Sequence, residues 1–133
     1  MEKLKQSILI PVDFREQSLA AISQSHNIAK LNDLDLTLLY VLEDSSFWAG
    51  LFSDAQEEEI LKRAKLNLEN LAERTRQESG LTVHTLVTKG KAYEQITEIA
   101  EKIEAKYIFI GVASMFFEEG KTKRIVGANA SRI

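Results

Sequence analysis

The sequence predicts an α/β domain in which an open parallel sheet carries helices on both faces. Two features of the 133 residues predict this fold class: short apolar runs recur along the chain, and longer segments with helical periodicity separate them. Runs that are apolar at successive positions are typical of strands buried on both faces. Strands that alternate with helices form βαβ units, whose right-handed crossovers build a parallel sheet.

The first strand is predicted over residues 7–12, a nearly continuous apolar run. Pro11 lies at its carboxyl end, where a missing N–H costs least. A helix is predicted over residues 16–31, because apolar and small residues recur there at the helical period. The residues expected on its inward face are Ser18, Ala21, Ile22, Ser25, Ile28 and Ala29.

The second strand is predicted over residues 36–42, which are again apolar at successive positions. Ser53 and Gln56 have the spacing of a capping box, so a long helix is expected to begin there and to run to about Ser79. Gly80 follows as a natural stop. The buried stripe of this helix is expected to consist of Ile60, Leu61, Ala64, Leu68, Leu71, Ala72 and Thr75.

A third strand, at an edge of the sheet, is predicted over residues 81–87, with a turn over 89–91. A helix over 92–105 and a fourth strand over 107–111 come next. Small, helix-compatible residues from Gly127 onward indicate the start of a last helix. The helix over 92–105 is expected to face the sheet with Tyr93, Ile96, Ile99, Ala100 and Ile103.

Composition excludes several classes of protein. Hydrophobic residues make up 44% and charged residues 28%, as in a soluble globular domain. The chain has no cysteine, which excludes disulfides and thiolate sites, and its formal net charge of −3 argues against nucleic-acid binding. The longest apolar run, residues 107–113, is shorter than the roughly 20 residues that span a bilayer. The N-terminus has no signal-peptide pattern, so we expect a cytoplasmic location and no membrane partner.

The ends of the predicted strands indicate where a ligand would sit. Open parallel sheets bind ligands beyond the carboxyl ends of the strands, where the strand order reverses. The residues in question are 11–13, 41–43, 111–114 and 127–129. If the first and fourth strands are neighbours, these ends line one crevice. From spacing alone, Asp13 fits a turn residue at least as well as a ligand contact.

Taken together, several segments resemble the universal stress protein family. They are residues 7–13, the helix pattern over 18–29, 36–41, Lys89-Gly90, 93–100, 107–111 and 127–131. The resemblance implies a Rossmann-like sheet with strand order 3-2-1-4-5 in a single domain over residues 1–133. Many members of that family bind ATP, and many form homodimers or tandem two-domain chains. The resemblance therefore implies ATP or another adenine nucleotide as ligand, with no metal beyond the magnesium that accompanies a nucleotide.

The family's binding residues can be carried over by position. Asp13 would meet the ribose or the adenine, and Pro11 and Val12 would shape the wall beside it. Val41 would offer its backbone to the adenine. No general base or metal ligand set is identifiable beyond Asp13, so ATP hydrolysis ranks last among the functions, and we expect no enzyme.

The phosphate loop departs from the family pattern. Gly111 and Gly127 would approach the phosphates, but Ser114 stands where a second glycine is expected. Twelve residues follow it before Gly127, where the family pattern has nine. Ala128 replaces a Ser or Thr whose hydroxyl would donate to a phosphate, and Asn129 is either a substitute polar group or a helix cap.

These departures leave a second function open. A member with an altered loop would act through protein–protein association, as a dimer or beside a tandem partner, without nucleotide. Apolar residues 115–117 and 47–52 fit a cover over the crevice, a partner contact or an anchor to the core equally well. Because the chain stops at Ile133, we expect no fifth strand in it, so the domain is either truncated there or the first half of a tandem protein. The outer side of the fourth strand would then be an unprotected edge.

Three further features have structural explanations. His26 is expected to be a partly buried residue without a role, and His84 has no partner that the sequence reveals. The run Glu57–Glu59 fits the first turn of a helix better than a metal site. The GxxxxGK[ST] pattern of P-loop hydrolases is absent from the sequence.

Overall fold

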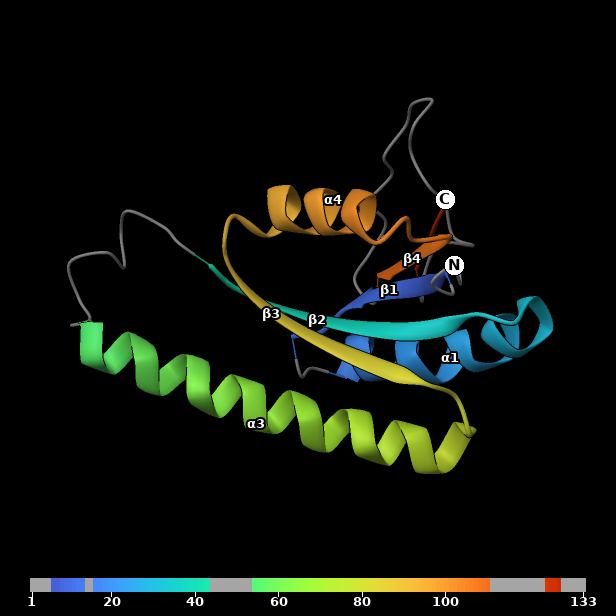
Figure 1. Cartoon of the computed structure of the whole chain (residues 1–133), viewed down its shortest axis with the longest axis horizontal. Coiled ribbons are helices and arrows are strands. Elements are labelled where there is room, and N and C mark those ends of the chain that lie inside the picture. Colours follow the sequence, from blue (N-terminus) through green and yellow to red (C-terminus); the bar gives the residue numbers. More distant parts are fainter. Residues whose placement is uncertain (1–5, 14–15, 44–53, 111–123, 128–133) are drawn as a thin grey trace, which may run out of the picture.

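The computed structural model describes residues 6–13, 16–43, 54–110 and 124–127. Strands and helices alternate along the chain from β1 to β4, as Figure 1 shows. In chain order the elements are β1 (Ser7–Pro11), α1 (Glu16–Asn32), β2 (Asp35–Glu43), α3 (Asp54–Ser79), β3 (Val83–Gly90), α4 (Ala92–Lys102), β4 (Tyr107–Ile110) and β5 (Arg124–Gly127). Of the described helices, none has the length and apolar character needed to cross a membrane.

The strands form one open sheet in the order β3-β2-β1-β4-β5, and all four pairings are parallel. This confirms the predicted fold class and strand order. The central strand is β1, with β2 on one side and β4 on the other. Ile8, Leu9 and Ile10 are fully buried, because helices cover β1 on both faces. This burial on both faces explains why β1 is apolar at successive positions.

Alternate residues of each strand feed two separate cores. On one face, Ile8, Ile10 and Val12 of the β1 segment lie in a cluster with residues of α1 and α3. On the other face, Leu9 and Ile108 lie in a second cluster with residues of α4. Helices therefore cover both faces, with α1 and α3 on one side of the sheet and α4 on the other (Figure 1).

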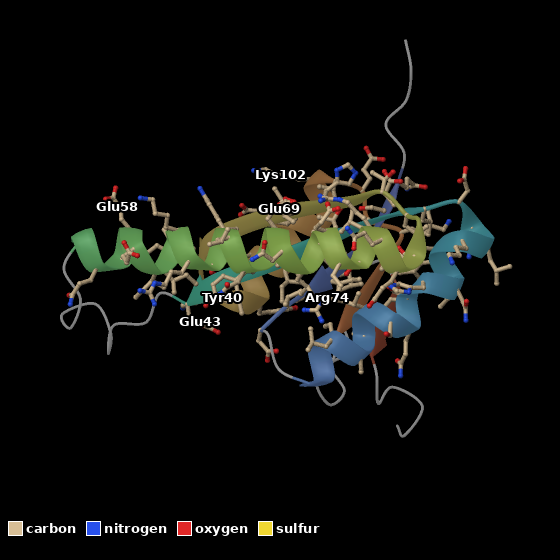
Figure 2. All side chains as sticks on the ribbon, turned by 90° about the horizontal axis from the view of Figure 1, so that it is seen from below. Tyr40, Glu43, Glu58, Glu69, Arg74 and Lys102 are labelled. Atoms are coloured by element: carbon tan, nitrogen blue, oxygen red, sulfur yellow. The ribbon has the colours of Figure 1, made fainter. Side chains whose placement is uncertain are left out.

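Helix α3 buries the stripe that its periodicity predicts over its C-terminal two thirds. Ala64, Leu68, Leu71, Ala72 and Thr75 are buried, while Ile60 and Leu61 are half-buried near the helix start. Side chains project from α3 along its whole length, as the view in Figure 2 shows. The helix ends as predicted, because Gly80 has a φ of +74° and donates its N–H to the Arg76 carbonyl at 2.8 Å. Ser53, the predicted cap, lies outside the described residues.

The expectation that the chain has no fifth strand is wrong. Residues Arg124–Gly127 pair with β4 as β5, with Ile110 beside Gly127. The outer side of β4 is therefore covered by this strand and is not an open edge. Ile125 and Val126 are β-branched, which favours a strand, and Gly127, predicted to begin a helix, is the last of the four residues of β5.

Two local predictions around α4 are also wrong. Lys89 and Gly90 belong to β3 rather than to a turn, because their residues pair with Leu42 and Glu43 of the longer β2. Tyr93 is half-exposed, since it lies in the first turn of α4. The other residues of that predicted face behave as expected, with Ile96, Ile99 and Ala100 buried and Ile103 packed against the same cluster.

Candidate functional site

The carboxyl end of β1 lies at the point where the strand order reverses. From β1 the chain moves outward through β2 and β3 on one side, then crosses over to β4 and β5 on the other. Strands one and four are thus neighbours, as the predicted site requires, with Leu9 beside Ile108. In open α/β sheets this reversal opens the space in which ligands bind.

The carboxyl edge of the sheet has a step between β1 and β2. β1 ends at Pro11, which is paired with Leu39, and the Val12 N–H still donates to the Leu39 carbonyl at 2.7 Å. β2 continues to Glu43, where it pairs with Gly90 of β3. The β2–β3 pair therefore extends beyond the end of β1.

The backbone of Val41 points across this step. In a parallel ladder, alternate residues turn both backbone groups to the same neighbouring strand. Leu36 donates its N–H to the Thr82 carbonyl, so even-numbered residues of β2 face β3, whereas the Leu39 carbonyl accepts from Val12 on the β1 side. The N–H and C=O of Val41, two residues further on, therefore face the β1 side beyond the last residue of β1.

The side chains of the predicted site leave the sheet in different directions. Val12 is buried in the cluster with α1 and α3, whereas Val41 packs against the cluster with α4. Pro11 is half-buried at the end of β1, and Asp13 is exposed just beyond it. Asp13 is therefore the predicted side chain that can meet a ligand here, while Val12 holds the backbone in place and Val41 can contribute its main chain.

The phosphate side of the predicted site is placed only in part. Gly127 lies at the carboxyl end of β5, beside Ile110, and not at the start of a helix as predicted. It does reach the same edge of the sheet as Pro11. Gly111, Ser114, Ala128 and Asn129 lie outside the described residues, so their assignment stays a prediction from the sequence.

An ion pair that the sequence did not reveal joins α3 to the carboxyl end of β3. Lys89 contacts Glu57, which lies in the first turns of α3. The run Glu57–Glu59 is thus part of a helix start, as predicted. Among the described residues, no group of three or more His, Asp or Glu side chains is placed to hold a metal ion.

The two histidines lie away from this edge. The sequence reveals no partner for His84, but in the structure its Nε2 lies 3.1 Å from Oδ2 of Asp35, because β3 lies beside the start of β2. Ser7 is not a partner of His84, since the Ser7 hydroxyl forms a hydrogen bond of 2.9 Å with the Thr37 hydroxyl. His26 is half-buried as predicted; burial, followed by the charge of Lys30, holds its pKa below the ordinary value.

Comparisons with known proteins agree with this geometry. The sequence matches the universal stress protein family over residues 5–133. Universal stress protein MJ0531 of Methanocaldococcus jannaschii is 30% identical over 135 residues, which cover 99% of this chain and 77% of that protein.

Two solved structures share the fold. A protein of the universal stress protein family from Burkholderia pseudomallei has a TM-score of 0.73 at 14% identity, with 95% of this chain and 97% of that chain covered. A universal stress protein family protein from Arabidopsis thaliana with AMP bound has a TM-score of 0.63 at 15% identity, with 96% and 94% covered. The match over nearly the whole chain, together with the 30% identical relative, shows that this chain belongs to the universal stress protein family.

Proposed function

We propose that this chain is a regulatory binding module that takes an adenine nucleotide at the step between β1 and β2. The observation that carries the proposal is the backbone of Val41, which faces the β1 side beyond the end of that strand. A main-chain N–H and C=O side by side match the donor and acceptor pattern on the edge of an adenine base. A family relative of the same fold is known with AMP bound, which supports the choice of ligand class.

Asp13 supplies the charged contact. It follows Val12, whose N–H is held by the Leu39 carbonyl, so the backbone that presents the carboxylate is fixed to β2. A carboxylate accepts hydrogen bonds from hydroxyls and repels phosphate, so Asp13 suits a ribose and not the phosphate chain. The phosphates would then lie toward β4 and β5, where Gly127 ends its strand.

Calorimetric titration with AMP and with ATP tests this function. We expect binding by the natural chain, a loss of about tenfold or more in affinity for Asp13→Ala, and unchanged affinity for Glu101→Ala. Glu101 is a suitable control because it is an exposed carboxylate in the last turn of α4, outside the residues that line the proposed site. The absence of heat and of any thermal shift at millimolar nucleotide would remove the proposal.

The sequence of the phosphate loop favours a second candidate, a nucleotide-independent association module. Ser114 and Ala128 replace residues that contact phosphate in the family pattern, and Phe116 and Phe117 place two large apolar groups between them. Light scattering separates the two functions. Association that is independent of AMP and is lost in the variant with Phe116→Ser and Phe117→Ser supports the second; an unchanged mass in that variant rejects it.

A further inference from the structure

The outer edge of β3 is the starting point, because β3 ends the sheet on one side (Figure 1). Leu36 of β2 donates to the Thr82 carbonyl, so even-numbered β3 residues face β2. The backbone groups of the odd-numbered residues therefore turn away from the sheet; these residues are Val83, Thr85, Val87 and Lys89. Such a row of outward groups is a template for pairing with another strand.

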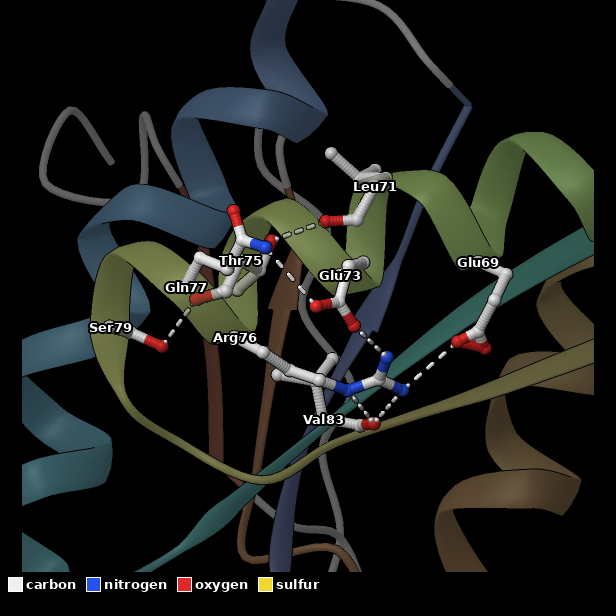
Figure 3. A network of polar contacts seen from close by, with 8 residues as sticks. All are labelled: Glu69, Leu71, Glu73, Thr75, Arg76, Gln77, Ser79 and Val83. Carbon is white, nitrogen blue, oxygen red and sulfur yellow. Dashed lines mark hydrogen bonds and ion pairs between the residues drawn. The ribbon is translucent and has the colours of Figure 1, made fainter.

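Arg76 covers the first carbonyl of this row. Its guanidinium donates to the Val83 carbonyl twice, from Nη2 at 2.7 Å and from Nε at 3.2 Å (Figure 3). The same group is held by two carboxylates of α3, with Nη1 at 3.0 Å from Glu73 and Nη2 at 3.0 Å from Glu69. The planar fork of an arginine can satisfy all three acceptors at once, which a lysine ammonium cannot do with the same geometry.

The turn after α3 fixes this contact. Gly80 reverses the chain with its positive φ, so that β3 runs back along the helix. The Ser79 hydroxyl donates to the Thr75 carbonyl at 2.6 Å and accepts the Leu81 N–H at 3.1 Å. These bonds, drawn in part in Figure 3, hold the end of α3 against the beginning of β3 and bring Arg76 to Val83.

We propose that Arg76 closes the outer edge of β3 and thereby prevents this strand from pairing with β3 of a second copy of the chain. A second copy fits this edge, because a two-fold axis would place the two β3 strands antiparallel. The outward N–H and C=O groups of one strand would then face those of the other. In the register that places Thr85 opposite Val87, Lys89 of one copy lies opposite Val83 of the other. In that register Lys89, which pairs with Glu57 of its own chain, lies near Glu69 and Glu73 of the second copy, the two carboxylates that contact Arg76.

The first test compares two arginine substitutions on the same helix. We expect Arg76→Met to raise the weight-average mass toward twice that of the natural chain, in a concentration-dependent way, by sedimentation or light scattering. Arg63→Met is the matched control, because Arg63 pairs with Glu59 on α3 at 3.5 Å and both side chains are exposed. Its mass should equal that of the natural chain.

The second test adds Thr85→Pro to the Arg76→Met variant. The Thr85 N–H points outward, so a proline there removes no bond to β2 but blocks an incoming strand. We expect the double variant to return to the natural mass. An Arg76→Met variant with unchanged mass, or association that survives Thr85→Pro, overturns the proposal. If circular dichroism shows that Arg76→Met does not fold, Arg76→Lys is judged by the same criteria.

Discussion

The two ends of the sheet are built differently. At the amino end, the segments before the strands are bound to one another: the Asp35 N–H donates to the Gln6 carbonyl and the Lys106 N–H to the Ser7 carbonyl. A side-chain contact between Asp35 and His84 also joins the strands there. At the carboxyl end, the strands stop at different levels, with β1 ending opposite Leu39 while β2 continues to Glu43.

Together with the proposed function, this difference predicts that the amino end contributes mainly to stability and the carboxyl end to binding. Polar groups that bond across strands at the amino end are satisfied within the fold, so they contribute to its stability. At the carboxyl end, the unequal strand lengths leave the backbone of Val41 facing past the last residue of β1, where the proposed function places the adenine. Substitutions at the two ends should therefore separate stability from ligand affinity.

The largest expected effect comes from truncating an apolar residue at the amino end. Leu36 is fully buried, so Leu36→Ala should lower the free energy of unfolding by about 2–5 kcal/mol through lost transfer energy and a cavity. Val41 is only partly buried, and Val41→Ala should lower it by about 1 kcal/mol. Urea unfolding measures both, and equal losses would contradict the division between the two ends.

The buried hydroxyl pair at the amino end should give an intermediate effect. Ser7 and Thr37 are both buried and bond to each other at 2.9 Å. Ser7→Ala leaves the Thr37 hydroxyl buried without this partner, and should cost about 1–3 kcal/mol of unfolding free energy. Adding Thr37→Val should restore part of that loss, because both polar groups are then gone. A double-mutant cycle with purely additive losses would show that the two hydroxyls are not coupled.

At the carboxyl end, Asp13→Ala should separate binding from folding. Asp13 is exposed, so its removal should change the free energy of unfolding by less than about 0.5 kcal/mol. The affinity for AMP should fall about tenfold or more, which corresponds to about 1.4 kcal/mol. Denaturation and calorimetry on the same preparation give both numbers, and a loss of stability without a loss of affinity would place Asp13 in the scaffold.

The smallest effect is expected between the two ends, at His26 on α1. Burial lowers its pKa in the folded chain, and Nε2 is buried without a hydrogen-bond partner among the described residues. The unfolded chain therefore takes up a proton near pH 6.5 before the folded chain does. Stability is full above that pH and falls as the pH drops through the lower, folded pKa.

His26→Leu should remove this loss on acidification. Thermal unfolding of the natural chain and the variant between pH 7.5 and pH 5 tests it, using the difference between the two melting temperatures. That difference should shift in favour of the leucine variant as the pH falls. A constant difference would mean that other groups account for the acid sensitivity.

Much of the fold could be predicted from the sequence, because periodicity depends on which faces are buried. The predicted strands over 7–12, 36–42 and 107–111 and the helix over 16–31 agree with the structure to within one or two residues. β5 was missed because four residues are too few to show a pattern and because Gly127 fitted a phosphate loop. Tyr93 was misplaced because the first turn of a helix is only half covered by its sheet.

The site could be predicted less completely, because it depends on register. The fold class already predicts that Pro11 and Val41 lie near each other. The step that leaves the Val41 backbone beyond the end of β1 depends on the pairing of Pro11 with Leu39. No local sequence pattern predicts that pairing. Asp35 and His84 are 49 residues apart and meet through the same kind of register. Arg76 and Val83 are only seven residues apart in the sequence, but they meet only because the chain reverses its direction at Gly80.

The hydrophobic clusters on the two faces of the sheet differ in size. We therefore expect the helices that cover them to unfold locally at different free energies. Within the described residues, the cluster against α1 and α3 contains the larger share of the fully buried side chains, including Phe109 and Leu68. The cluster beneath α4 is smaller and relies on a helix of 11 residues. Amide protons of α4 should therefore exchange with solvent through a lower-energy fluctuation than those in the middle of α3, so the two faces of one sheet would belong to different cooperative units.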